Sequence, residues 1–194
     1  MIIGVDEAGR GPLAGPVVAA AVSLGSAKID GLGDSKALSE KRRAALEPII
    51  REQCLFGIGI ASVDEIDAVN IFQATMIAMT RAVDALCQQA GAEPQHIVID
   101  GNKTPLGRVA EWRWQSCEAI VKGDAKEPCI SAASILAKEL RDRMMQELCA
   151  AHPGYGFSKH KGYGTAEHMA ALKALGPTIH HRKSFAPVAQ LTLL

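Results

Sequence analysis

The sequence of 194 residues has few aromatic side chains and no long apolar run. Phe, Trp and Tyr make up 4% of it, although apolar residues as a whole make up 48%. A helix that spans a membrane needs roughly 18 or more consecutive apolar residues, and no segment supplies them. The opening from Met1 reaches the acids Asp6 and Glu7 too soon for the apolar part of a secretory signal. We therefore expect a cytoplasmic protein without membrane contact.

Paired cysteines are lacking as well. The five cysteines are an odd number, and no two of them have the C-x-x-C spacing of a zinc or redox site. We therefore expect free thiols, buried in a reducing compartment, and no zinc. Charged residues make up 22% of the chain, which argues against a disordered protein.

An excess of charge of either sign is also absent, because the net charge is zero. The distribution is uneven, however. From Tyr155 onward, basic side chains outnumber acidic ones by four, and the first 154 residues carry the opposite excess. An acidic body with a basic C-terminal part could hold cations in one place and phosphates in another, although ordinary variation explains the pattern equally well.

Apolar patterning predicts alternating strands and helices. Strands are expected at residues 2–7, 17–24, 54–62, 96–100 and 116–121. Helices are expected at 39–51, 70–88 and 128–149 and from Thr165 onward, with a loop at 152–164. Short connections between the first three strands predict antiparallel pairing, and helices before the later strands predict parallel pairing. We therefore expect an α/β fold with a mixed five-stranded sheet, flanked by helices.

The chain is expected to divide after residue 150. Residues 1–150 would form the core, and residues 151–194 would form a helical C-terminal appendage.

Acidic side chains follow the predicted strands. Asp6 and Glu7 close the first strand, Asp100 closes the fourth, and Asp124 comes shortly after the fifth. Ligands bind at the carboxyl ends of parallel strands, where four carboxylates would repel one another unless they bound cations or protons. Oxygen ligands favour Mg²⁺ or Mn²⁺, although each acid alone could be a turn or capping residue. Adjacent residues face opposite sides of a strand, so Asp6 and Glu7 reach one site only if the strand ends or bends there.

A glycine-rich segment, Gly9 to Gly15, follows the first two acids. Its spacing is G-x-G-x-x-x-G, which differs from the G-x-G-x-x-G of dinucleotide-binding proteins. The two carboxylates before it would also repel a pyrophosphate. The glycines would let the backbone approach a ligand closely beside Arg10, or they could simply form a tight turn.

Blocks of sequence spread over nearly the whole chain follow one order. They are Asp6–Val18, Asp34–Ser39, Ile99–Asn102, Lys122–Asp124, Ala132–Lys138, Arg141–Asp142, His152–Phe157, His160–Thr165 and His181–Phe185. In this order they resemble the motifs of bacterial ribonuclease HII, the type 2 ribonuclease H. The resemblance implies a ribonuclease H-like fold for the mixed sheet.

The same resemblance implies residue roles. Asp6, Glu7, Asp100 and Asp124 match the family's catalytic, metal-binding carboxylates. Gly9, Arg10 and Gly11 match its motif for the ribose 2′-OH, and Tyr163 matches a tyrosine that packs on the deoxyribose just 3′ of the ribonucleotide. The implied enzyme is an endonuclease that cuts 5′ to a ribonucleotide in RNA/DNA hybrids or in duplex DNA with embedded ribonucleotides. It would use two Mg²⁺ or Mn²⁺ ions and leave 3′-OH and 5′-phosphate ends, as in ribonucleotide excision repair and DNA replication.

The helix predicted after Pro128 offers further contacts. Ser134, Lys138 and Arg141 share one face of it, and Ser134 and Lys138 could bind phosphate or simply form a solvated face. Lys36 is another candidate for contact with the nucleic-acid backbone. Asp142 is expected to form a surface ion pair.

Two histidines and the last five residues each allow two interpretations. His180 and His181 could suggest a metal-free nuclease, but a loop role is the stronger reading because no second acid or base is placed beside them. Gln190, Leu191, Leu193 and Leu194 lie in a segment resembling the peptide with which bacterial proteins bind the sliding clamp, with Leu194 in place of Phe. A frayed end is the alternative.

Three classes of function remain for this sequence. The first is a two-metal endonuclease, the second is a non-catalytic module that binds RNA/DNA hybrids, and the third is a nucleotide-binding oxidoreductase. The four intact acids favour the first over the second, and the glycine spacing disfavours the third. We expect a monomer.

Overall fold

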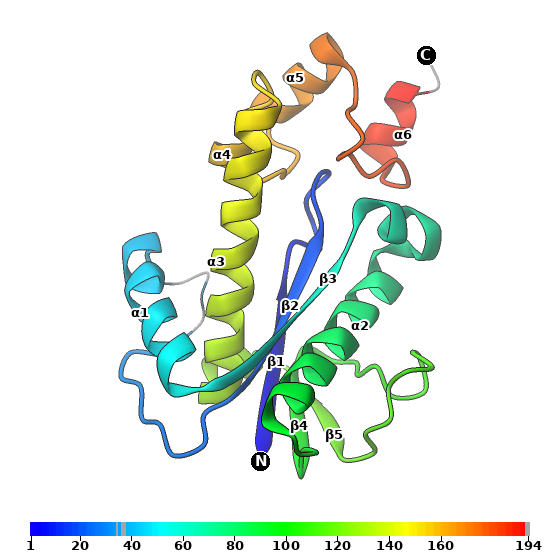
Figure 1. The fold of residues 1–194 in the computed structure, drawn as a ribbon. Helices are drawn as coiled ribbons and strands as arrows, with labels where there is room; N and C mark the ends of the chain where they lie inside the picture. The colour runs from blue at the N-terminus through cyan, green and yellow to red at the C-terminus, as the bar shows by residue number, and fades with distance from the viewer. Residues whose placement is uncertain (34, 36–37, 193–194) are drawn as a thin grey trace.

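The computed structural model describes residues 1–33, 35 and 38–192 and contains one five-stranded sheet (Figure 1). The strands are β1 (Ile2–Ala8), β2 (Val17–Ser23), β3 (Leu55–Ala61), β4 (His96–Asp100) and β5 (Cys117–Ile120). Their order is β3-β2-β1-β4-β5. Strands β1, β2 and β3 pair antiparallel, whereas β4 pairs parallel with both β1 and β5. The predicted mixed sheet is confirmed, with its antiparallel and parallel halves as expected.

Helices cover both faces of the sheet. They are α1 (Glu40–Gln53), α2 (Val63–Ala90), α3 (Pro128–Ala151), α4 (Phe157–His160), α5 (Ala166–Leu175) and α6 (Ala186–Thr192), with a short 3₁₀ turn η1 (Gly123–Ala125). In Figure 1, α1 and α3 lie on one face and α2 on the other, while α4, α5 and α6 gather at the end of the sheet opposite the N-terminus. The helical C-terminal appendage is therefore confirmed. The predicted loop at 152–164 is wrong where the one-turn helix α4 interrupts it.

Helix α2 begins earlier than predicted and is broken. The predicted start, Asn70, has a non-helical φ of 70° and interrupts α2. The segment is therefore two helices joined end to end. The Asn70 side chain accepts the backbone N–H of Gln73 at 3.0 Å, which makes it the cap of the second helix. Ser62 and Glu65 form a capping box for the first. The first helix, residues 63–69, is too short to show an apolar period.

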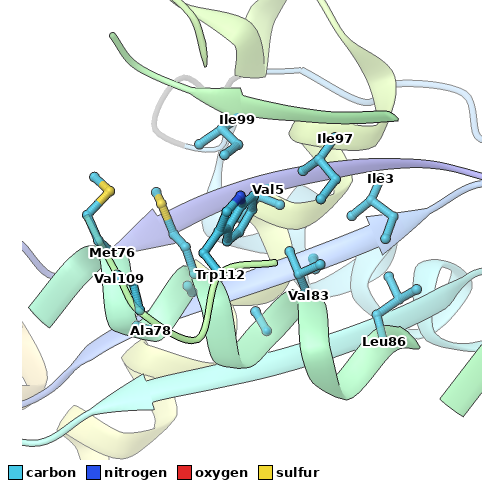
Figure 2. Close-up of a cluster of buried hydrophobic side chains, with 14 of the residues drawn as sticks. Ile3, Val5, Met76, Ala78, Val83, Leu86, Ile97, Ile99, Val109 and Trp112 are labelled. Carbon is cyan, nitrogen blue, oxygen red and sulfur yellow. The ribbon is translucent and has the colours of Figure 1, made fainter. Parts of the chain in front are cut away.

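One core fills the space between the sheet and α2 (Figure 2). Ile3 and Ile97 from the strands face Val83 and Leu86 from the helix, and Trp112 closes the cluster from the loop after β4. Glycines on β3 let α2 approach, because a Cβ at Gly57 or Gly59 would collide with the α2 backbone.

A second core lies on the opposite face. Val18 and Ala20 of β2 pack against Leu46 of α1 and against Ala133 and Ala137 of α3. Successive β2 residues alternate between the two cores, which is why its predicted run is uniformly apolar. The small alanines of α3 let this helix pack closely on β1 and β2.

All five cysteines are free thiols, as predicted. Cys54, Cys87 and Cys129 are buried as expected, whereas Cys117 and Cys149 are only partly buried. Within the part of the chain that the structure describes, no helix combines the length and apolarity needed to cross a membrane.

Candidate active site

Three of the predicted carboxylates lie near one another at the edge of the sheet formed by the carboxyl ends of β1 and β4. Asp6 and Glu7 lie near the end of β1, and Asp100 is the last residue of the parallel neighbour β4. Asp6 is only 4% exposed. Burial, followed by the negative charges of Glu7 and Asp100, raises the pKa of Asp6 well above its ordinary value. The three side chains therefore interact electrostatically.

The end of β1 allows its two adjacent acids to serve one site. The Asp6 carboxylate accepts the backbone N–H of Glu7 at 2.7 Å and the hydroxyl of Ser134 on α3. Glu7 lines a neighbouring cavity. The strand ends at Ala8, and Gly9 has a φ of 97°, which turns the chain away at once. Asp6 and Glu7 can therefore reach one site, which the sequence predicted only if the strand ended or bent here.

The fourth carboxylate comes from a turn bound to the third. The N–H of Gly123 donates to Asp100 Oδ1 at 2.7 Å, and Lys122 before it has a left-handed φ of 57°. A Cβ at Gly123 would come within 2.6 Å of the end of the Ile130 side chain, so a larger residue here would force that side chain to shift. Asp124 is the next residue and is 9% exposed. Its backbone is thus held beside Asp100.

The donor chemistry of this edge fits a hard divalent cation. Within residues 1–33, 35 and 38–192, no three His, Cys, Asp or Glu side chains are gathered closely enough to form a finished metal site. The available donors are carboxylate oxygens, which Mg²⁺ and Mn²⁺ prefer. A cation would offset both the burial and the repulsion that raise the pKa of Asp6. Binding would therefore draw the side chains together around the ion.

A cavity of about 470 Å³ lies beside the carboxylates. It is lined by Glu7, Ala8, Gly9, Arg10, Gly11, Ser35, Ile71, Lys138, Arg141 and Tyr163. The Tyr163 side chain is 48% exposed, and its ring comes within 3.3 Å of the position that a Cβ on Gly11 would take. The structure therefore brings the glycine segment, Tyr163 and Lys138 to one surface next to Glu7.

The other predicted contacts are placed differently. Ser134 is buried and hydrogen-bonded to Ser35 and Asp6, so the solvated-face alternative is wrong for it. Lys138 lines the cavity and donates to both oxygens of Asp142 at 2.6 Å. Lys36 lies outside the described residues.

The surface ion pair expected for Asp142 is wrong, because Asp142 is only 6% exposed. Helix α1 covers this part of α3 and brings Arg43 to within 3.8 Å of Asp142. Arg43 also donates to Glu139 at 2.7 Å and to the carbonyl of Ser35 at 3.0 Å. The result is a buried charge network at the rear of the cavity.

Two buried arginines, Arg141 and Arg182, hold the glycine segment. Arg141 donates to the carbonyls of Ala14 and Pro16, both at 3.0 Å. Arg182 donates to Gly9 at 2.6 Å and to Arg10 at 2.9 Å. Burial lowers the pKa of Arg141 to about 10, and burial together with the charge of Arg141 lowers that of Arg182 to about 9. Both remain cationic at neutral pH.

The positioning role of these arginines was missed in the sequence. Arginines that bind carbonyl oxygens have no acidic partner with a recognisable spacing. One feature of the sequence could have indicated their role. The segment from Gly9 to Gly15 has few side chains that could stabilise its own conformation.

Comparison with known proteins identifies the family. The model of the family described as Ribonuclease HII matches residues 3–188. The chain belongs to the ribonuclease HII family. It is 60% identical to a Ribonuclease HII from Novosphingobium aromaticivorans, over 99% of this chain and 98% of the relative. It is 61% identical to one from Sphingopyxis alaskensis, over 100% of this chain and 93% of the relative.

Solved structures show the same fold. The ribonuclease H2 of Pyrococcus horikoshii OT3 aligns with a TM-score of 0.78 at 25% identity, over 98% of this chain and 96% of that one. An RNase HII from Archaeoglobus fulgidus, solved in a complex with PCNA, aligns with a TM-score of 0.75 at 25% identity, over 98% and 96% of the two chains. Bst-RNase HIII, solved with Mn²⁺, has a TM-score of 0.73 at 20% identity, over 99% and 69%.

The family decides between the function classes. Ribonuclease HII enzymes cleave RNA in RNA/DNA hybrids, and this chain is a ribonuclease H of that family. The expected enzyme and ribonuclease H-like fold are confirmed. The non-catalytic hybrid-binding module and the oxidoreductase are set aside.

Proposed function

We propose that this enzyme hydrolyses the phosphodiester 5′ to a ribonucleotide, in RNA/DNA hybrids and in duplex DNA with embedded ribonucleotides, leaving 3′-OH and 5′-phosphate ends. One observation carries the proposal. The edge where Asp6, Glu7 and Asp100 meet adjoins a cavity lined by Gly9–Gly11 and Tyr163. Groups able to hold cations thus stand beside a surface able to contact a sugar, which is the arrangement that ribonucleotide-specific cleavage requires.

The four carboxylates are proposed to hold two divalent ions, Mg²⁺ or Mn²⁺. When bound, such a pair supplies a water of lowered pKa and neutralises the leaving 3′ oxygen. Asp6 interacts with both Glu7 and Asp100, which suits Asp6 and Asp100 to shared positions and Glu7 and Asp124 to flanking ones. The Mn²⁺ bound in the structure of Bst-RNase HIII supports a divalent ion in this fold.

Recognition of the ribose is assigned to Gly9, Arg10 and Gly11. A 2′-OH both donates and accepts hydrogen bonds, so main-chain groups can test for it without a side chain in the way. Arg182 binds the carbonyls of Gly9 and Arg10 from the buried side, which fixes the segment while its other side lines the cavity. A rigid main chain can then discriminate ribose from deoxyribose.

The next sugar is assigned to Tyr163. Its half-exposed ring lies against Gly11 at the mouth of the cavity, where a flat ring tolerates deoxyribose better than ribose. Residues 151–194 would thus form the substrate-contacting part of the chain. Lys138 at the cavity, together with Lys36 and Ser134, is proposed to contact phosphates.

The C-terminal segment is proposed to bind a bacterial sliding clamp. The complex of the Archaeoglobus fulgidus relative with PCNA supports a clamp as partner. Gln190 is exposed, whereas Leu191 packs partly against the cluster around Leu172 and Val188, so docking would compete with that contact. Leu193 and Leu194 lie outside the described residues. A monomer acting in the cytoplasm, in ribonucleotide excision repair and DNA replication, completes the proposal.

The test uses a DNA duplex with one ribonucleotide, with Mg²⁺, Mn²⁺ or a chelator, beside the Asp100→Asn variant. Metal-dependent cleavage on the 5′ side, lost in the variant, is expected. The product ends are checked with a ligase, which needs a 5′-phosphate and a 3′-OH. Cleavage on the 3′ side, or cleavage that survives the chelator, would refute the mechanism.

A further inference from the structure

Two buried histidines outside the carboxylate site face each other. His168 on α5 and His181, just before Arg182, are both fully buried, and their Nε2 atoms are 3.0 Å apart. Both rings pack against Phe157. Burial lowers the pKa of His168, and burial together with His168 lowers that of His181 to about 4, so both rings are neutral at neutral pH.

The hydrogen bonds fix which nitrogen of each ring carries its proton. The backbone N–H of Thr178 donates to Nδ1 of His181 at 2.9 Å, so the proton of that neutral ring is on Nε2. This Nε2–H donates to Nε2 of His168, whose own proton must then be on Nδ1. His168 Nδ1 in turn donates to the carbonyl of Tyr163 at 2.9 Å. The chain of donors therefore runs in one direction and ends on Tyr163.

The backbone at His181 also reaches the glycine segment. His181 pairs with Ala14 in an isolated antiparallel bridge. The N–H of Arg182 donates to the carbonyl of Leu13 at 2.8 Å, and the N–H of Leu13 donates to Gly162, the neighbour of Tyr163, also at 2.8 Å. The contacts close into a ring that runs from the glycine segment through both histidines to Tyr163 and back.

We propose that His168 and His181 are positioning residues that fix Tyr163 against the glycine segment and thereby set the preference for a deoxyribonucleotide 3′ of the ribonucleotide. The inference rests on the proposed roles of Gly9–Gly11 and Tyr163. The exposed Tyr163 ring touches the cavity, whereas its backbone carries the hydrogen bond from His168. A small rotation of that peptide would move the ring across the cavity, so the sugar it meets depends on the histidine pair.

A matched pair of variants separates positioning from packing. His181→Phe keeps a ring against Phe157 but donates nothing, and His181→Gln keeps an N–H near the position of Nε2. The readout is the ratio of kcat/KM for a duplex whose ribonucleotide is followed by deoxyribose to that for one followed by ribose. We expect His181→Phe to lower this ratio about fivefold, the effect of one ordinary hydrogen bond, toward the ratio of Tyr163→Ala. His181→Gln should keep the ratio of the unaltered enzyme.

The outcomes separate this inference from the proposed function. A folded His181→Phe variant with an unchanged ratio overturns the inference, even if its melting temperature falls. Failure of the unaltered enzyme to cut either duplex, or an unchanged ratio in Tyr163→Ala, overturns the proposed function, and the inference with it.

A second measurement needs no variant. The ¹⁵N NMR spectrum of the unaltered protein should show His181 protonated on Nε2 and His168 on Nδ1. Any other pair of tautomers would overturn the inference.

Discussion

The guanidinium of Arg182 donates to the carbonyl of Gly9 across 2.6 Å, although the two residues are 173 positions apart in the sequence. The same side chain also binds the carbonyls of Arg10 and Gly15. One residue from the C-terminal part of the chain thus replaces the internal hydrogen bonds that the glycine segment lacks.

Replacing Arg182 by Met should therefore destabilise the enzyme and weaken its activity together. Met fills part of the space but leaves the carbonyls of Gly9, Arg10 and Gly15 buried without this donor. The free energy of unfolding should fall by about 3 kcal/mol, since each buried group left unsatisfied costs roughly 1–3 kcal/mol. Denaturant unfolding of Arg182→Met and Arg182→Lys measures this free energy. We expect the stability of the lysine variant to lie between that of the methionine variant and that of the unaltered enzyme. Equal stability of all three would contradict the anchoring role.

Alanine at Gly9 should cost more than alanine at another glycine of similar backbone conformation. Gly9 and Gly107 have φ of 97° and 71°, so both substitutions strain the backbone by about 1 kcal/mol. A Cβ at Gly9 would also collide with Arg141, whereas no atom lies within 4 Å of the corresponding position at Gly107. We expect Gly9→Ala to lose at least about tenfold in kcat/KM and Gly107→Ala to cleave normally. Similar kinetics for the two variants would show that the close contact with Arg141 is unimportant.

Asparagine at Asp6 should stabilise the metal-free protein while abolishing cleavage. The folded-state pKa of Asp6 is raised, so ionisation of Asp6 favours the unfolded chain as soon as the pH exceeds the ordinary value near 3.8. Below the ordinary pKa near 3.8, Asp6 is protonated in both the folded and the unfolded state and the cost vanishes. The stability advantage of Asp6→Asn should therefore grow as the pH rises from 3.8 through the raised folded-state value and then level off. Melting temperatures in chelator across this range measure it.

Addition of Mg²⁺ provides the control for the Asp6 variant. The ion should raise the melting temperature of the unaltered enzyme, because it binds only the folded state, and should raise that of Asp6→Asn less. An equal rise in both proteins would show that Asp6 is not a ligand.

Loss of Arg43 should be far more damaging than loss of an exposed arginine with similar ion pairs. The Arg43 and Glu139 side chains are 9% and 11% exposed, so Arg43→Met leaves buried carboxylates without their partner, at a cost of about 3–5 kcal/mol. Arg113 pairs with Asp84 at side-chain exposures of 49% and 37%, and Arg113→Met should cost about 1 kcal/mol or less. Denaturant unfolding compares the stabilities of the two variants. Comparable losses of stability would mean that burial does not determine how much an ion pair contributes.

Deleting residues 190–194 should abolish binding to a bacterial sliding clamp and leave cleavage of a short duplex unchanged, because neither Gln190 nor Leu191 lines the cavity. Surface plasmon resonance with immobilised clamp measures the binding. Clamp binding that survives the deletion, or no binding by the unaltered enzyme, would refute this role.

The sheet and its row of acids were predictable because each depends on local pattern. Strand periodicity places Asp6 and Asp100 at strand ends, and parallel pairing then brings those ends together. Helix α3 was predictable only in part. It contacts the sheet on one face, while α1 and the glycine segment cover much of the other, so Arg141 and Asp142 look like surface residues in the sequence although they are buried.

The contacts of His181 and Arg182 were out of reach for the same reason. Their partners are mostly backbone groups and one distant imidazole, neither of which imposes a residue type at a fixed spacing. The tertiary structure alone reveals them.

The dependence of the glycine segment on Arg182 has a consequence for biosynthesis. Gly9 leaves the ribosome long before Arg182, whose side chain binds its carbonyl, because 173 positions separate the two residues. The sheet and α2 can form earlier, since their partners are nearer in sequence. A nascent chain therefore carries Asp6 and Glu7 before Arg182 can fix the main chain that follows them, and we expect nuclease activity only once Arg182 has been added.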